Sequence, residues 1–281
     1  MAGTLFLVAT PIGNLEDITL RALRVLREVS IIAAEDTRRT ARLLAHYGLT
    51  TPMLSFHEHN SHGRTPQLMA KLAAGESVAV VTDAGTPGVS DPGVELVQAC
   101  VQAGIAIDPV PGASAPLAAV VASGFPVLPL TICGFPPNRS KPRSEWIAAV
   151  SRLQSTVTFF EAPHRLIQTL TDAVPLLGNR QILVARELTK LHQEFIRGTA
   201  EALAREITEV RGEVTVVVEP PQTPTVKRVE LTDNDLADKI GLMTDTGGLS
   251  RGQIAARAAK ELGMTRREVY AALERAKQSG K

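Results

Sequence analysis

Short apolar runs alternate along residues 4–219 with segments in which apolar residues recur at helical spacing. Val78–Val81 is such a run, and its length and flanking turn residues are typical of a buried strand in a parallel sheet. Further runs lie at 4–9, 31–34, 105–107, 130–135, 156–160, 182–185 and 212–219. Because strands and helices alternate, the pattern predicts an α/β fold of the doubly wound kind, whose strand ends face one crevice.

The segment after Val81 is the most unusual loop of the chain. Residues 83–93 contain the glycines 85, 88 and 93, the prolines 87 and 92, two aspartates and no basic residue. Glycine lets the main chain approach a ligand closely, and loops that follow parallel strands are where open α/β sheets bind ligands. The loop matches no phosphate-binding pattern. It therefore predicts a site for a cationic, hydroxyl-rich or amine-rich ligand, with a turn that serves only the fold as the alternative.

Turn-forming and proline-rich stretches of the chain predict four segments. They are a first α/β domain over 1–116, a second over 117–220, an extended proline-rich linker over 221–230, and a helical module over 231–281. In the module, Ser250 with Gln253 and Thr265 with Glu268 fit capping boxes, so we expect a helix-turn-helix-like pair. Its basic side chains fit either nucleic-acid binding or the solvated face of a dimerising pair.

Composition narrows the class of protein. The chain has 281 residues, 44% of them hydrophobic, and a net charge of +1, so any nucleic-acid-binding surface is local. Cys100 and Cys133 are far apart, which favours a reduced, cytoplasmic protein. The apolar run near the amino terminus ends at Pro11, and no basic region precedes it. We therefore expect neither a signal peptide nor a membrane span. We expect no metal, because a mobile polar loop explains the histidines at 57–62 as well as a metal site does.

Polar residues cluster after several predicted strands. Acids and arginines occupy 35–39, an acidic and basic group occupies 161–165, and another occupies 186–190. Residues 136–143 form a basic, proline-rich loop that suits either phosphate binding or an ordinary charged surface. Before the first of these clusters, Asp17 is expected to cap a helix whose apolar stripe is Ile18, Leu20, Leu23, Val25 and Leu26.

Five ordered blocks of the sequence carry a resemblance to a known family. They are residues 8–15 (VATPIGNL), 34–38 (AEDTR), 83–93 (DAGTPGVSDPG), 163–165 (PHR) and 186–190 (RELTK). These blocks resemble the signatures of the ribosomal RNA small subunit methyltransferase I family, in the tetrapyrrole methylase superfamily. The resemblance covers about residues 4–219, and the carboxyl-terminal module is also similar. The chain departs from the family at Thr82, usually serine, and at Phe160–Ala162, usually Tyr-Glu-Ser.

The resemblance implies a reaction, a cofactor and partners. S-adenosylmethionine would bind in a cleft between two α/β domains, and its methyl group would go to a cytidine ribose 2′-hydroxyl in the decoding region of 16S rRNA. The partners implied are the 16S rRNA or 30S subunit and a second copy of the chain, with no membrane. By analogy, the cofactor residues are Pro11, Asp83, Ala84, Gly85, Thr86, Ala113, Ser114, Phe135, Glu161, Pro163 and Leu188.

Direct displacement at a methyl carbon needs orientation and removal of a proton. We expect the catalytic residues to be Asp36, Glu35, Glu187 and Lys190, with His164 as a further candidate, and the RNA-binding residues to be Arg38, Arg139, Lys141, Arg143, Arg165, Arg186, Arg266 and Arg267. Any one of them could instead be a structural ion pair that anchors a loop.

Two other functions remain open from the sequence. A precorrin-type tetrapyrrole methylase would share the fold and the methyl donor but would have no use for the basic loop and the helical module. A non-catalytic RNA-binding or ribosome-assembly protein would keep the basic module but would not need an intact donor cleft.

Overall fold

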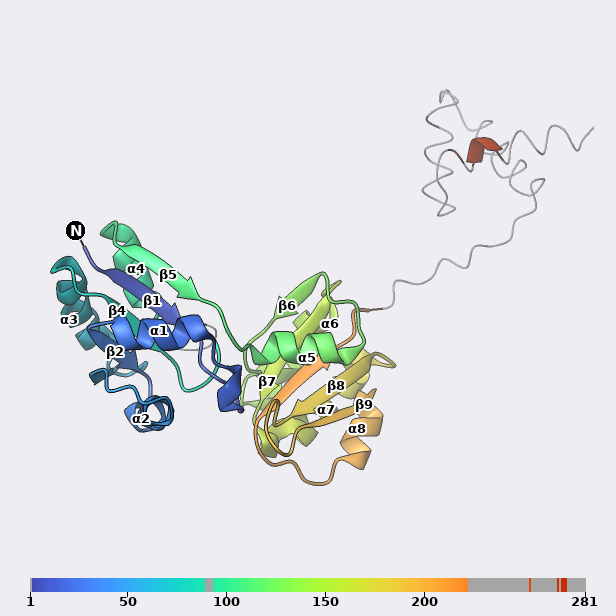
Figure 1. Ribbon diagram of the computed structural model, residues 1–281. Helices are drawn as coiled ribbons and strands as arrows, with labels where there is room; N and C mark the ends of the chain where they lie inside the picture. Colours follow the sequence, from blue (N-terminus) through green and yellow to red (C-terminus); the bar gives the residue numbers. More distant parts are fainter. Residues whose placement is uncertain (1, 89–92, 222–252, 254–266, 268, 272–281) are drawn as a thin grey trace, which may run out of the picture. The chain divides into compact units, whose positions relative to one another are not determined.

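The computed structural model describes residues 2–88, 93–221, 253, 267 and 269–271 (Figure 1). Contacts within the chain divide it into two units, Met1–Pro221 and Gln222–Lys281. Ser90–Pro92, most of the predicted linker, and Ser250, Gly263, Thr265, Arg266 and Glu268 of the predicted module lie outside the described residues. Of the module, the described residues 253, 267 and 269–271 are helical, and Arg267 is exposed. The predicted domain boundaries stay a prediction.

The first sheet has five parallel strands. Their order is β3 (Met53–Ser55), β2 (Ile31–Ala34), β4 (Val78–Val81), β1 (Thr4–Val8) and β5 (Ala106–Val110). One face packs against α1 (Leu20–Glu28) and α2 (Thr37–His46), the other against α3 (Ser61–Ala73) and α4 (Val94–Gln102) (Figure 1). The doubly wound arrangement predicted from the sequence is confirmed for this sheet.

The reason β4 is apolar throughout is visible in its packing. Successive side chains of a strand point to opposite faces. Ala79 and Val81 pack with α1 and α2, whereas Val78 and Val80 pack with α3 and α4. A strand covered on both faces gains from an apolar residue at every position.

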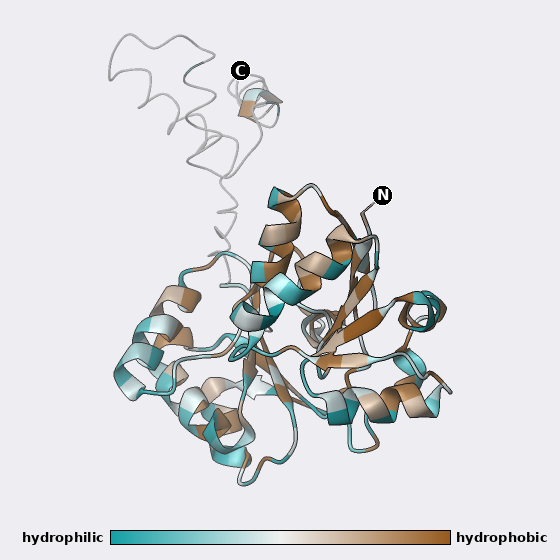
Figure 2. Ribbon diagram, turned by 90° about the vertical axis from the view of Figure 1, so that its left-hand side faces the viewer, coloured by the Kyte–Doolittle hydropathy of each residue, from teal (hydrophilic) through white to brown (hydrophobic). Residues whose placement is uncertain are grey.

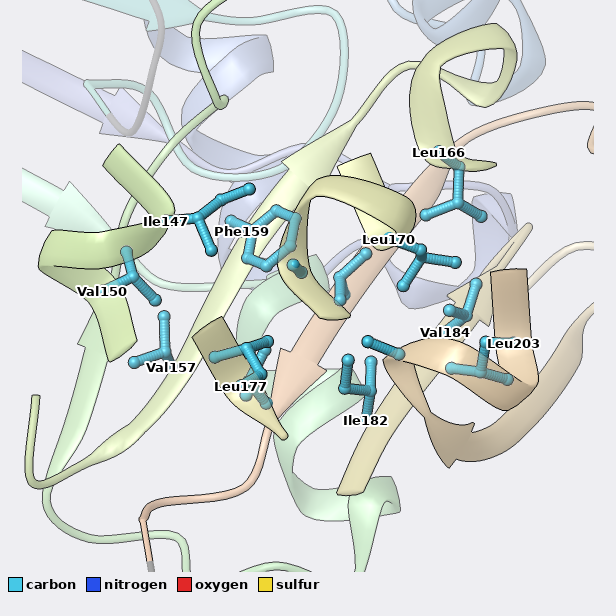
Figure 3. Packing of buried hydrophobic residues seen from close by; sticks show 14 of the residues in the cluster. Ile147, Val150, Val157, Phe159, Leu166, Leu170, Leu177, Ile182, Val184 and Leu203 are labelled. Carbon is cyan, nitrogen blue, oxygen red and sulfur yellow. The ribbon is translucent and has the colours of Figure 1, made fainter. Parts of the chain in front are cut away.

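The second sheet is mixed. Its order is β6 (Leu130–Ile132), β7 (Thr156–Glu161), β10 (Val214–Val218), β8 (Gln181–Arg186) and β9 (Glu194–Thr199), and only the β6–β7 pair is parallel. Helix α5 (Ala115–Ser123) covers one face. Helices α6 (Ser140–Ser151), α7 (Leu166–Leu177) and α8 (Ala200–Glu206) cover the other, as Figure 3 shows from their packed side chains. In Figure 2 the strands are mainly hydrophobic and the helices carry hydrophilic residues as well.

The structure corrects several local predictions. The sequence analysis missed β3 and β9, because three half-buried residues and a strand of mixed polarity give no apolar run. The predicted helix cap at Asp17 is wrong. Asp17 ends a short 3-10 turn, η1 (Leu15–Asp17), and the Thr19 hydroxyl oxygen caps α1 by accepting the Ala22 amide, 3.0 Å away. Residues 140–143 lie in α6 rather than in a loop.

No helix in the described part of the chain has both the length and the apolar character that crossing a bilayer requires.

Candidate functional site

Three loops at the carboxyl ends of the parallel strands are joined by hydrogen bonds. Between the β1 and β4 loops, the Thr10 amide donates to the Gly85 carbonyl (2.9 Å) and the Gly85 amide donates to the Thr10 carbonyl (3.0 Å). The Thr86 hydroxyl donates to the carbonyl of Ala113, in the loop after β5 (3.4 Å). These bonds hold the glycine-rich loop as one backbone wall at the edge where such sheets bind ligands.

Two glycines make this close approach possible. Gly85 has φ of +84°, a backbone conformation that side chains disfavour. At Gly112, a Cβ would lie 2.9 Å from the Cβ of Ala9, closer than packed carbon atoms approach. Small residues are therefore needed where the β1 and β5 loops meet.

The acidic loops after β2 and β4 bind each other's backbone. The Asp36 amide donates to Asp83 Oδ1 (3.1 Å), and the Asp83 amide donates to Glu35 Oε2 (3.0 Å). Arg39 Nε lies 3.5 Å from Asp83 Oδ2. Both carboxylates are thus fixed in position, and one arginine partly balances their charge.

The opposite wall comes from the second sheet. The rings of Phe135 and Phe160 lie 5.3 Å apart, and Phe135 is 57% exposed. The buried carboxylate of Glu161 accepts bonds from the Ala162 amide (2.7 Å), the Thr169 hydroxyl (2.5 Å) and the Arg165 guanidinium. Its side chain therefore holds the 161–163 backbone in place rather than offering a free charge.

Between these walls lies a cleft of about 390 Å³. Of the predicted cofactor residues, those that line it are Asp83, Ala84, Gly85, Thr86, Ser114, Phe135, Glu161 and Pro163. Pro11 lines an adjacent cavity instead. Leu188 is buried in an apolar cluster with Ile12 and does not line the cleft, and the carbonyl of Ala113 accepts the Thr86 hydroxyl.

A strained turn places Lys190 in the adjacent cavity and pairs it with Glu187, which lines neither cavity. Glu187 and Thr189 have φ of +51° and +63°, values that cost energy for residues other than glycine. Lys190 Nζ lies 2.8 Å from Glu187 Oε1 and 3.1 Å from Glu213 Oε2, and the Glu213 amide donates to Glu187 Oε1 (2.8 Å). Gly13 leaves room for Lys190, because a Cβ there would lie 2.5 Å from Lys190 Cγ.

The ionisation of these groups follows from their contacts. Burial works to lower the pKa of Lys190, but hydrogen bonds to Glu187 and Glu213 outweigh burial and raise it. The hydrogen bond from Lys190 lowers the pKa of Glu187. At neutral pH the turn therefore presents an ammonium group and a carboxylate, so Lys190 is a cation and not a ready base.

Asp36 acts as the cap of helix α2. Its carboxylate caps α2 by accepting the Arg38 amide (2.8 Å) and pairs with the Arg38 side chain (2.8 Å). The side-chain hydrogen bond from Arg38 is the main cause that lowers the pKa of Asp36 to about 2. Asp36 lines neither cavity, which argues against the prediction that it is catalytic. Glu35 lines the cleft.

The sequence is similar to those of known proteins. Residues 4–204 match the family of Tetrapyrrole (Corrin/Porphyrin) Methylases. A curated protein of Synechocystis sp., named ribosomal RNA small subunit methyltransferase I, is 46% identical over 272 residues, which cover 95% of this chain and 96% of the relative. A protein of the same name from Thermotoga maritima is 49% identical over 77% of this chain and 98% of its own length.

The chain belongs to the ribosomal RNA small subunit methyltransferase I family of tetrapyrrole methylases. The resemblance carried by its five sequence blocks is thereby confirmed. Among solved structures, uroporphyrin-III C-methyltransferase from Thermus thermophilus, complexed with S-adenyl homocysteine, is similar with a TM-score of 0.54 and 19% identity, covering 77% of this chain and 97% of that one. That likeness shows the shared fold.

In this member of the methyltransferase I family, several cations predicted to bind RNA have other partners. Arg143 is buried and pairs with Asp172 (2.8 Å), which argues against its assignment to RNA. Arg165 forms an ion pair with the buried carboxylate of Glu161. Arg186 pairs with Glu194 (2.8 Å) outside both cavities. Arg38 is exposed but pairs with Asp36, and Arg139 and Lys141 are exposed near the start of α6.

The sequence analysis of this family member also missed residues of the site. Arg39 and Glu213 line both cavities, and Arg42 lines the second. Glu213 had a usable signal, since it is the polar residue next to an apolar strand that ends the domain. Arg39 and Arg42 had none beyond charge, because only the orientation of α2 decides which of its arginines face a cavity.

Proposed function

We propose that this protein is a methyltransferase that uses S-adenosylmethionine to methylate the 2′-hydroxyl of a cytidine ribose in the decoding region of 16S rRNA. The observation that carries the proposal is a cleft lined by the family's sequence blocks, in a chain 46% identical over nearly its whole length to a named ribosomal RNA small subunit methyltransferase I. The cleft adjoins a second cavity, which contains a lysine. The two cavities together give room for two substrates side by side.

The residues of the cleft fit the proposed methyl donor. The volume of about 390 Å³ lies within the range of small-molecule sites, roughly 300–1,000 Å³. Asp83 and Glu35 suit a ligand that carries a sulfonium and an ammonium group. Phe135 and Pro163 offer apolar surface to an aromatic base, and the bridged loop at Gly85 offers main-chain donors and acceptors. A fold relative has been solved with S-adenyl homocysteine.

The donor supplies an electrophilic methyl group, and the residues of the chain would position and activate the hydroxyl. The fixed walls would hold the ribose oxygen in line for attack, an effect of orientation. The Lys190 ammonium, held by Glu187 and Glu213, would stabilise the negative charge that develops on that oxygen. Glu35, the predicted catalytic carboxylate that lines the cleft, is our candidate to accept the proton.

The proposal is tested with 30S subunits that lack the modification and with S-adenosylmethionine labelled in its methyl group. We expect label in 16S rRNA, at a cytidine 2′-oxygen by mass spectrometry. A label that enters a tetrapyrrole and never RNA would instead support the precorrin-type alternative. Calorimetry with S-adenosylmethionine tests the non-catalytic alternative, which has no need to bind the donor.

Three further properties are proposed from the family resemblance and the composition. They are a homodimeric state, a cytoplasmic location, and a division of the α/β region near residue 116. The last falls in the first turn of α5, which packs on the second sheet. Gel filtration with light scattering tests the dimer.

A further inference from the structure

A second cavity, of about 310 Å³, lies beside the donor cleft. The two share part of their lining, including Ile12, Arg39 and Asp83. The second cavity also contains Lys190 and Arg42. A molecule bound in the second cavity would therefore lie next to a molecule bound in the cleft.

The basic groups of this cavity differ in how firmly they are held. Lys190 is tied to two carboxylates at 2.8 and 3.1 Å. Arg39 has only a long contact of 3.5 Å with Asp83, and its side chain is 58% exposed. Arg42 is exposed and forms no ion pair or side-chain hydrogen bond with any residue that the structure describes. Two guanidinium groups are thus available to a ligand.

Helix α2 places these two arginines together. Residues three apart are neighbours on the surface of a helix, so Arg39 and Arg42 lie on one side of α2. Thr40, Leu43 and Leu44 are buried on its inner side, which fixes the rotation of the helix against the first sheet. The arginine pair is therefore presented by a rigid element.

Paired guanidinium groups favour phosphate, because their planar donors match two phosphate oxygens at once. An RNA strand carries a phosphate on each side of every ribose. We propose that the second cavity receives the target ribose of the RNA strand and that Arg39 and Arg42 bind the phosphates flanking it. This inference rests on the proposed function. It moves the RNA contact nearest the reaction to α2 and away from Arg143, Arg165 and Arg186.

The test is steady-state kinetics with unmodified 30S subunits for wild type, Arg42→Gln, Arg42→Lys and Arg205→Gln. Arg205 is the matched control, because it is an exposed helical arginine paired with Glu201 and lines neither cavity. We expect Arg42→Gln to raise the KM for subunits about tenfold, the effect of one charge-assisted hydrogen bond, with kcat and the Kd for S-adenosylmethionine within about twofold. Arg42→Lys should show a smaller rise.

Salt dependence gives a second readout. The slope of log KM against log salt should fall by about 0.7–0.9 in Arg42→Gln, as for the loss of one phosphate contact, and should not change in Arg205→Gln. If wild type methylates the subunits and Arg42→Gln has the KM and slope of Arg205→Gln, this inference alone is overturned. If wild type transfers no methyl group to RNA, both the proposed function and this inference are overturned.

Discussion

At the scale of single residues, the site depends on charges that are held by neighbours. Lys190 is kept protonated by Glu187 and Glu213, and Asp83 is fixed by the amide of Asp36. Glu161 is buried and holds the main chain of one wall. Each of these side chains can be altered separately, and each alteration is expected to change a different measured quantity.

Lys190→Ala is expected to lower kcat by about 10²-fold, the usual effect of removing a group that stabilises a developing negative charge. The Kd for S-adenosylmethionine should stay within about threefold, because Lys190 lines the second cavity and not the cleft. Methyl transfer and calorimetry measure the two quantities. Lys71→Ala removes a lysine paired with Glu76 outside both cavities and serves as the control. A kcat equal to that control would remove Lys190 from the catalytic residues.

Asp36→Asn tests, through pH, what the charge of Asp36 contributes to stability, because the side-chain oxygen of asparagine can still cap α2. The folded-state pKa of about 2 lies below the ordinary value of 3.8, so ionised Asp36 stabilises the fold above about pH 4, and this contribution is lost as the pH falls toward 2. The difference in Tm between wild type and Asp36→Asn should therefore shrink over that range. At neutral pH, kcat should change less than threefold; a larger loss would restore Asp36 as a catalytic candidate.

Glu161→Ala is expected to lower the free energy of unfolding by about 3 kcal/mol, because it leaves the largely buried Arg165 guanidinium without its carboxylate. Urea denaturation measures the change. Glu201→Ala removes an exposed carboxylate from an i,i+4 pair with Arg205 and should cost less than about 1 kcal/mol. Equal costs for the two variants would mean that the buried pair contributes no more than a surface pair.

At the scale of elements, the first-sheet wall of the site is built from loops that follow parallel strands and are joined to one another. The bridge between Thr10 and Gly85 connects the β1 and β4 loops, and the Asp83 and Glu35 bonds connect the β4 and β2 loops. The strands themselves supply position, and the loops supply the contacting groups.

Gly85→Ala is expected to weaken donor binding, because a Cβ at φ of +84° strains the bridged loop. The backbone cost should be about 1–2 kcal/mol. Gly48→Ala is a control, because Gly48 too has a positive φ (+64°). It lies outside both cavities, and a Cβ there would meet no atom within 4 Å. Both variants should lose similar stability, and only Gly85→Ala should raise the Kd for S-adenosylmethionine. Equal affinities in the two variants would contradict a role for the loop in holding the donor.

At the scale of the whole α/β region, one apolar cluster connects the two sheets. It contains Ile12 from the β1 loop, Val120 from α5, Leu183 from β8, Leu188 from the turn after β8, and Val217 from β10. A shared cluster of buried side chains makes the stability of each sheet depend on the other. The cleft walls should therefore form and disappear together.

The two sheets are accordingly expected to unfold in one transition. Trp146 is the single tryptophan and packs against Phe159 beside the second sheet, so its fluorescence reports on that sheet, whereas far-UV circular dichroism reports on both. The two midpoints in urea should coincide for the wild type. Ile12→Ala should lower both urea midpoints by the same amount, which corresponds to a loss of about 3 kcal/mol in the free energy of unfolding. Separate midpoints would show that the sheets unfold independently.

The sequence by itself determined the α/β class, the five family blocks and the strands that are apolar throughout, because burial on both faces of a sheet leaves a local pattern. The glycine-rich loop after Val81 could be identified in the same way, since positive φ and close backbone approach require glycine locally. Only the tertiary structure decided which charged residues face the site. Arg143 and Arg39 are both arginines near a strand end or helix start, yet one is buried against Asp172 and the other lines the cleft. The pairing of Lys190 with Glu213, 23 residues away in sequence, was likewise invisible to any local pattern, because it is created when β8 and β10 pair in the folded sheet.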